Sequence, residues 1–140
     1  MTRGQMAIIT KGGILTSVEF NGDMYLDHNG YGEDAIESLR NSTDVATYQY
    51  EVAKFNVEHH HYDDDRLVYT KDKSALDFTK DYFDVWFSDY VYIKNLTKED
   101  YELLTEKRDH EGRKIGVKKV NLAPNEIAVL CFGRLVKITN

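Results

Sequence analysis

The stretch QMAIITKGGILTSVEF (residues 5–20) holds two runs rich in β-branched residues, with Lys11, Gly12 and Gly13 between them. Paired glycines adopt the positive φ angles that a tight turn requires. Flanking runs of this composition are typical of β-strands. The stretch therefore predicts a β-hairpin close to the N-terminus.

Two helices are predicted after this hairpin. The segment EDAIESLRN (residues 33–41) has acidic residues in its first turn and Arg40 in its last, as the helix dipole favours. In the next segment four apolar residues recur at helical spacing: Val45, Tyr48, Val52 and Phe55. We expect Ser42 or Thr43 to be the N-cap of this second helix.

Most of the remaining chain predicts strands. The strongest signal is FDVWFSDYVYIKNL (residues 83–96), an alternating aromatic and aliphatic run with a turn or bulge at Ser88-Asp89. Shorter strands are expected at residues 66–70, 115–122, 126–132 and 135–138. Residues 97–108 fit either a helix capped by Thr97 or a four-residue turn that leads into a strand.

The fold class that follows is α+β. We expect a mainly antiparallel β-sheet with an N-terminal hairpin and two helices packed on one face. The length of 140 residues fits a single domain, residues 1–140. Ten tyrosines are an unusual number, and those that are buried need partners for their hydroxyl groups.

The charge and composition limit the partners. Eighteen basic and twenty-four acidic residues give a formal net charge of −6, which argues against duplex nucleic acid, although a few arginines can still hold a small anion. No apolar run approaches the roughly 20 residues that span a membrane, and nothing resembles a signal peptide. Cys131 is the only cysteine, so we expect no internal disulfide and a reducing, cytoplasmic location.

The stretch VEHHHYDDDR (residues 57–66) invites a metal hypothesis. Consecutive helical residues lie about 100° apart, so the three histidines cannot all face one ion, and neither the zinc-ligand set nor the helical two-histidine motif is present. We interpret the stretch as a solvated loop with no metal, from which Arg66 can reach a ligand. A metal-dependent hydrolase that uses His59 to Asp65 remains the alternative.

No nucleophile or cofactor motif stands out. Cys131 lies between Leu130 and Phe132 in an apolar strand, where a cysteine usually packs as a small hydrophobe. The P-loop and the dinucleotide-binding glycine pattern are both missing from the sequence. We therefore expect no catalytic residue, no cofactor and no enzymatic activity.

Aromatic residues and arginines give the clearest indication of function. Trp86 lies on the opposite face of its β segment from Phe87 and its neighbours, and Arg66, Arg108 and Arg113 flank that segment in polar loops. Bases stack on aromatic rings for roughly 1–3 kcal/mol each. Charge-assisted hydrogen bonds from arginine add roughly 1.5–3 kcal/mol each. This combination predicts a site for a nucleotide-like anion.

The N-terminal third resembles a group of small phage proteins. These begin with Thr-Arg and carry an N/D-G-Y-P element, which the segments MTRGQMAIIT, HNGYG and EDAIESL match apart from Gly32 in place of proline. The strand DYVYIKNL is similar to that group as well. The layout resembles the Thoeris anti-defence 1 family, phage sponges that sequester the glycocyclic ADP-ribose signals made by TIR enzymes.

The resemblance implies a non-enzymatic binder in the cytoplasm of an infected bacterium. Such a protein would be a homo-oligomer, a dimer or a trimer of dimers, with pockets between subunits. Some members of the family also hold cyclic oligonucleotides of the CBASS system at a separate site. The residues here that match the implied roles are Phe87 or Trp86 for the base, Asn95 for a ribose or base edge, and Arg66, Arg108 and Arg113 for the pyrophosphate.

A third hypothesis rests on the acidic composition alone. A chain of net charge −6 is also consistent with an inhibitor that docks its carboxylates onto a basic host protein. That hypothesis leaves the aromatic residues and the arginines without a role.

Overall fold

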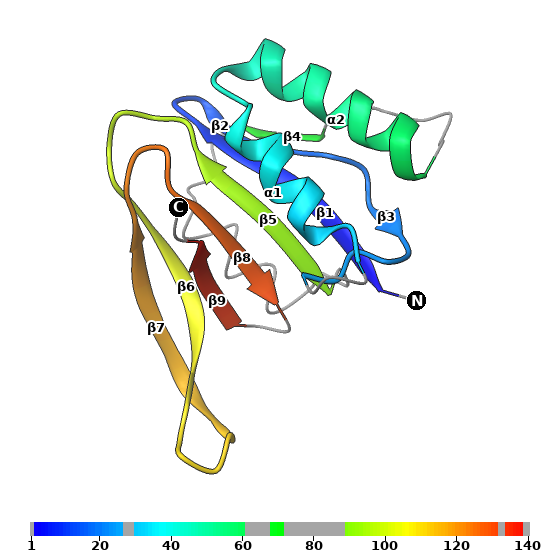
Figure 1. The fold of residues 1–140 in the computed structure, drawn as a ribbon. Helices are drawn as coiled ribbons and strands as arrows, with labels where there is room; N and C mark the ends of the chain where they lie inside the picture. Colours follow the sequence, from blue (N-terminus) through cyan, green and yellow to red (C-terminus); the bar gives the residue numbers. More distant parts are fainter. Residues whose placement is uncertain (1, 27–29, 61–67, 72–88, 132–133, 139–140) are drawn as a thin grey trace.

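The computed structural model describes residues 2–26, 30–60, 68–71, 89–131 and 134–138, and every structural statement below concerns these residues (Figure 1). The elements within them are β1 (Arg3–Thr10), β2 (Gly13–Thr16), β3 (Phe20–Asn21), α1 (Gly32–Arg40), α2 (Val45–His59), β4 (Val68–Lys71), β5 (Tyr90–Asn95), β6 (Tyr101–Arg108), β7 (Lys114–Leu122), β8 (Ile127–Cys131) and β9 (Arg134–Ile138). The β prediction for residues 83–88 lies outside the described residues.

The main sheet has the strand order β4-β2-β1-β5-β8-β9, and β3 pairs with β1. The predicted hairpin is confirmed: β1 and β2 pair antiparallel, with Thr10 opposite Gly13. One pair is parallel, because β5 runs beside β1 from Gly4 opposite Tyr90 to Ile9 opposite Asn95. The α+β class with a mainly antiparallel sheet is therefore confirmed, with a single parallel pair at its centre.

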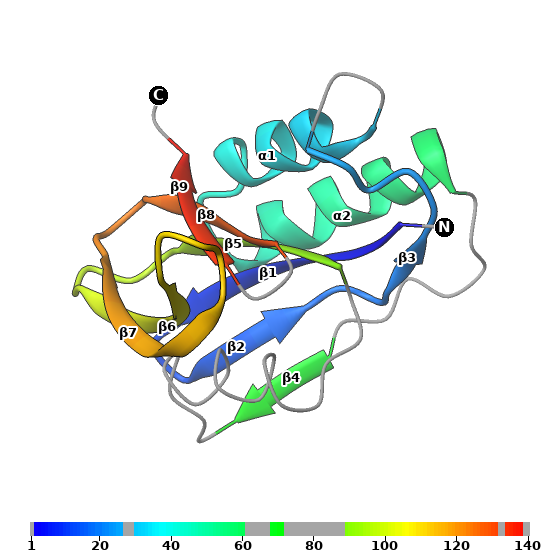
Figure 2. The same ribbon diagram turned by 90° about the horizontal axis from the view of Figure 1, so that it is seen from below.

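Both helices cover the same face of the sheet, as predicted (Figure 2). The N-cap of α2 is Asp44, so the prediction of Ser42 or Thr43 was wrong. The Asp44 carboxylate accepts from Thr47 N at 2.8 Å and Thr47 Oγ1 accepts from Asp44 N at 3.0 Å, a complete capping box. The Ser42 hydroxyl belongs to the preceding helix instead, because it donates to Ser38 O at 2.7 Å.

The sheet is buried on both faces. The helix-covered core is the cluster formed by Met6, Ile8, Phe20, Met24, Ala35, Ile36, Leu39, Tyr48, Val52, Phe55, Tyr92, Ile127 and Val129. The hairpin-covered core is the cluster formed by Ala7, Ile9, Ile14, Val91, Ile93, Leu103, Leu122, Ala128 and Leu130. Of the four residues predicted to form the apolar stripe of α2, only Val45 is exposed, since it is the first residue of the helix.

The hairpin arm, which we define as β6, β7 and their connecting turn, packs on the second face. Residues 97–108 thus form a turn and a strand, the second of the two alternatives left open by the sequence. Leu103 and Leu122, near the base of the arm, are fully buried. The distal part of the arm extends beyond the main sheet in Figure 1, and its described side chains there are exposed apart from the half-buried Asp109.

Gly32 occupies the position where the resembling phage family carries proline. Its N–H donates to Tyr25 O at 2.7 Å, a hydrogen bond that proline cannot make. A Cβ atom at Gly32 would also collide with the Tyr25 carbonyl and the Tyr92 hydroxyl. The turn before α1 therefore requires glycine in this chain, and proline would not fit.

Candidate functional site

An apolar concavity of about 510 Å³ lies where three loops meet, and we call it the three-loop groove. Three connections line it: the β1–β2 turn, the α1–α2 loop and the β5–β6 turn. Its lining residues are Thr10, Lys11, Thr43, Asp44, Val45, Leu96, Thr97, Lys98, Glu99 and Tyr101. All of them lie in connections or at the ends of elements, so the groove exists because the fold brings three distant loops together.

Lys94 of β5 holds the α1–α2 loop in place through hydrogen bonds to its backbone. This side chain is only 5% exposed, and its Nζ donates to Leu39 O at 2.9 Å and to Ser42 O at 2.7 Å. Burial lowers the pKa of Lys94 from its ordinary value. The carbonyls at the end of α1 carry the negative end of the helix dipole, which compensates for part of the cost of burying an ammonium group.

The β5–β6 turn is held in place by Asn95, which is fully buried. Asn95 Nδ2 donates to Glu99 O at 2.8 Å and to Leu122 O at 3.0 Å, while Oδ1 accepts from Thr97 N at 2.9 Å and from Thr97 Oγ1 at 2.7 Å. An amide group can make four such hydrogen bonds, so its capacity is used within the chain. Asn95 therefore supports the floor of the groove, and its predicted contact with a ligand stays a prediction.

The rim of the groove carries two ammonium groups from different loops. Lys11 and Lys98 are exposed, and neither forms an ion pair with any other residue in the described part of the chain. The Asp44 carboxylate is turned toward α2, where the Thr47 backbone N–H lowers its pKa. Val45, Leu96 and the half-buried Tyr101 supply apolar surface. The groove thus combines free cations with an aromatic ring.

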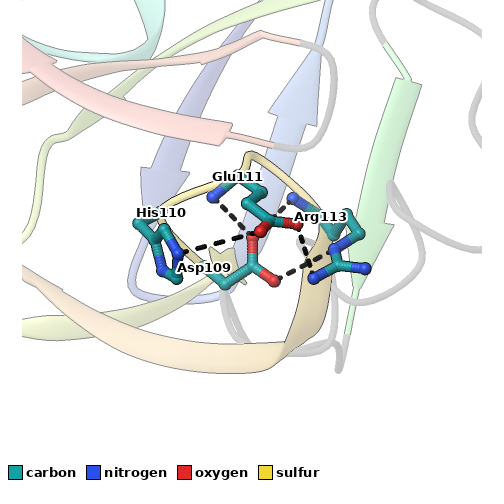
Figure 3. Close-up of polar contacts among 4 residues, drawn as sticks. All are labelled: Asp109, His110, Glu111 and Arg113. Carbon is teal, nitrogen blue, oxygen red and sulfur yellow. Dashed lines mark hydrogen bonds and ion pairs between the residues drawn. The ribbon is translucent and has the colours of Figure 1, made fainter.

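Arg113 lies far from this groove, at the tip of the hairpin arm (Figure 3). Its Nη2 is 2.6 Å from Glu111 Oε2 and its Nε is 3.3 Å from Asp109 Oδ2. Asp109 Oδ1 also accepts from Glu111 N and Arg113 N, which fixes the turn. A strand the length of β6 spans roughly 25 Å at about 3.3 Å per residue, so Arg113 and Asn95 do not share a site within one chain.

The other predicted ligand-binding residues cannot be placed in a site. Arg108 is the last residue of β6, beside a register shift in the pairing of β6 with β7. Arg66, Trp86 and Phe87 lie outside the described residues. The predicted stacking platform and pyrophosphate clamp therefore stay predictions.

The interpretation of His59 and His60 as solvated loop residues was wrong. His59 ends α2, stacks on Tyr31 at a ring-centroid distance of 4.1 Å and has Nε2 3.0 Å from Asp34 Oδ2, without hydrogen-bond alignment. His60 packs on Phe20 at 4.8 Å, with Nε2 3.1 Å from Gly22 O. The helix extends further than the sequence suggested, and its end is packed between α1 and β3.

This packing bears on the metal hypothesis and on the lone thiol. Within the residues that the structure describes, no group of three or more His, Cys, Asp or Glu side chains is arranged to hold a metal ion. The remaining members of the stretch, residues 61–65, lie outside those residues. Cys131 is half-buried against the helix-covered core, and burial raises the pKa of its thiol, which agrees with a packing role.

Sequence reasoning missed the residues that line the three-loop groove. The turn at Lys11 and the polar segment at Thr97 were both recognised, but nothing local indicates that they meet. The parallel pairing of β1 with β5 places these two turns side by side.

Comparisons with protein-family models, with curated proteins and with solved structures found no match to this chain. Among the described residues, no helix has the length and apolar character needed to cross a membrane.

Proposed function

We propose that this protein binds a small nucleotide signal and sequesters it without degrading it. The observation that carries the proposal is the three-loop groove, in which Lys11, Lys98 and Tyr101 gather around one apolar concavity. Ammonium groups suit phosphate oxygens, and a tyrosine ring suits a base. The resemblance of the N-terminal third to the Thoeris anti-defence sponges favours glycocyclic ADP-ribose as the ligand, with CBASS cyclic oligonucleotides as the second class.

The magnitudes fit a sponge that depends on enclosure. A sponge that outcompetes a signalling receptor needs nanomolar affinity, about −12 kcal/mol. A ligand of about thirty-five heavy atoms supplies roughly −10 kcal/mol at about −0.3 kcal/mol per atom. The groove is only partly enclosed, so the remaining affinity requires a further wall. A second copy of the chain would supply one, and the proposed active form is a homo-oligomer in the host cytoplasm.

Sequestration without chemistry agrees with how the groove uses Asp44, one of the two carboxylates that line it. The Asp44 side chain accepts two hydrogen bonds from Thr47 and caps α2. A carboxylate fixed in this way is a structural group, because moving it would uncap the helix. Binding energy in such a groove stabilises the bound ligand, which suits a sponge better than an enzyme.

Titration calorimetry and heat release test the proposal together. We expect nanomolar binding of glycocyclic ADP-ribose or of a cyclic dinucleotide, followed by recovery of the intact molecule by mass spectrometry after heat denaturation. Combined Lys11→Ala and Lys98→Ala should weaken binding at least tenfold, since each charge-assisted hydrogen bond contributes about 1.5–3 kcal/mol. Combined Lys107→Ala and Lys118→Ala on the exposed hairpin arm is the matched control.

Two outcomes would overturn the proposal. Recovery of a cleaved ligand would indicate an enzyme, and the metal-dependent hydrolase would be tested next by metal analysis of untagged protein. Failure to bind either nucleotide class would remove the sponge hypothesis. If neither nucleotide class binds and a pull-down from host lysate recovers one host protein in stoichiometric amount, the acidic-inhibitor hypothesis is favoured.

A further inference from the structure

Lys94 and Asn95 are consecutive residues at the end of β5, and both are buried polar side chains. Consecutive strand residues point to opposite faces of a sheet. Lys94 accordingly reaches toward the helices, and Asn95 reaches toward the hairpin arm. A buried ammonium and a buried amide side by side are costly unless each is fully hydrogen-bonded.

Each of the two side chains holds a different wall of the three-loop groove. Lys94 Nζ bonds to Leu39 O and Ser42 O, and Thr43 and Asp44 of the groove follow directly. Asn95 bonds to Thr97 and Glu99, which line the opposite side.

The third wall is attached at the same level of the sheet. Leu96 N donates to Ile9 O at 3.0 Å, one residue before Thr10 enters the groove. Asn95 N donates to Glu126 O at 3.1 Å, which ties β5 to the start of β8. The β1–β2 turn and the β5–β6 turn therefore leave the sheet from one row of backbone hydrogen bonds. The α1–α2 loop joins two helices, and Lys94 Nζ ties it to the same level of the sheet.

We infer that Lys94 and Asn95 are positioning residues that set the width of the three-loop groove. The inference rests on the proposed function for its effect on ligand affinity, but its structural part concerns the two loops alone. Loss of Lys94 should release residues 42–44, and loss of the Asn95 amide donors should release residues 97–99. A nucleotide that spans the groove would lose affinity in both cases, because it must then order a loop on binding.

The test compares three variants of β5 by hydrogen exchange and by calorimetry with glycocyclic ADP-ribose and a cyclic dinucleotide. Lys94→Met keeps the length of the side chain and removes the donors. Asn95→Asp keeps an oxygen acceptor for Thr97 and removes the donors to Glu99 O and Leu122 O. Ile93→Val is the matched control, because Ile93 is buried in the same strand and does not line the groove.

We expect faster exchange at the amides of residues 42–44 in Lys94→Met only, and at those of residues 97–99 in Asn95→Asp only. Each variant should bind the nucleotide at least tenfold more weakly than the wild type, at a temperature well below its melting point, while Ile93→Val keeps the wild-type affinity. Should Lys94→Met fail to fold, Asn95→Asp and Thr97→Val carry the exchange test for one wall.

The failures are distinguishable. Exchange that rises uniformly over the β1–β5 ladder in Lys94→Met and Asn95→Asp would show that both residues stabilise the whole fold, and it would overturn the inference. The inference would also be overturned if Lys94→Met and Asn95→Asp bound the nucleotide with the same affinity as Ile93→Val. If the wild-type chain binds no nucleotide, the proposed function fails, and the exchange pattern still decides whether the two side chains hold the two loops.

Discussion

The two faces of the central sheet are covered in different ways. The helix-covered core contains aromatic rings and tyrosine hydroxyls, whereas the described members of the hairpin-covered core are alanine, valine, isoleucine and leucine. On β1 the division follows residue parity, with Met6 and Ile8 facing the helices and Ala7 and Ile9 facing the hairpin arm. Neighbouring residues of one strand therefore belong to cores with different chemistry.

Among the described residues, tyrosine hydroxyls fix orientation within the helix-covered core, whereas the hairpin-covered core itself consists of aliphatic area. Tyr48 OH donates to Met6 O at 2.7 Å, and Tyr92 OH donates to Met24 O at 2.6 Å. Such directional bonds fix where a helix or turn lies on the sheet. On the other face, the described base of the hairpin arm packs through Leu103 and Leu122, whose apolar contacts have no direction, and receives one directional bond, from Asn95 Nδ2 to Leu122 O. The arm should therefore tolerate small shifts that the helices would not.

The largest expected effect compares one large apolar residue from each core. Phe55→Ala should destabilise the fold by about 3–5 kcal/mol, because Phe55 is buried and meets Phe20 edge-on at 5.2 Å. Leu103→Ala should cost about 2 kcal/mol, the low end for leucine, because the arm can settle into the space. Urea unfolding of both variants measures the difference.

Hydrogen exchange in the same two variants distinguishes destabilisation of the whole fold from destabilisation of the hairpin arm. Phe55→Ala should raise hydrogen exchange throughout the sheet, whereas Leu103→Ala should raise it mainly in β6 and β7. A larger loss of stability in Leu103→Ala than in Phe55→Ala would contradict the difference between the two cores.

A smaller effect is expected from removing one directional bond. Tyr48→Phe should lower the free energy of unfolding by about 1 kcal/mol. The cost stays at that level because Met6 O keeps a second hydrogen bond, from Ser17 N at 2.8 Å. Tyr50→Phe is the control on the same helix, since Tyr50 is 67% exposed and should show no change. Equal stability of the wild type and Tyr48→Phe would mean that the hydroxyl does not anchor α2.

The hairpin, both helices and most strands could be predicted from the sequence because their signals are local. Each signal lies within a short stretch of sequence. Examples are the glycine pair Gly12-Gly13, the helical spacing from Tyr48 to Phe55 and the short apolar runs of the strands. The cap of α2 was missed by one or two positions, since Ser42, Thr43 and Asp44 are all good N-caps and only the path of the chain selects among them. The burial of His59 and His60 depends on β3 and α1, which no local pattern indicates.

The candidate site was harder to predict for the same reason. The three-loop groove depends on the parallel pairing of β1 with β5, two strands separated by both helices. Asn95 was assigned to a ribose or base edge through the resemblance to the phage family, but its bonds to Glu99 and Leu122 depend on the neighbouring turn and strand. Lys94 gave no signal at all, because a lysine in an alternating strand is usually solvated.

The smallest expected effect concerns the N-cap of α2, Asp44. Asp44→Ala should lower the melting temperature slightly at neutral pH, because the first turn of α2 loses its cap, whereas Asp44→Asn should keep the wild-type value. The pKa of Asp44 is lowered from 3.8 by its bonds to Thr47, so its carboxylate stabilises the folded state above that pH and loses this effect as the pH falls through its folded-state pKa. Thermal unfolding from pH 7 to about pH 3 should therefore close the gap between the wild type and Asp44→Ala, while the gap between Asp44→Asn and Asp44→Ala remains. A wild-type advantage that persists undiminished in acid would show that the charge of the cap contributes nothing, and that Asp44 stabilises α2 through its hydrogen bonds to Thr47 alone.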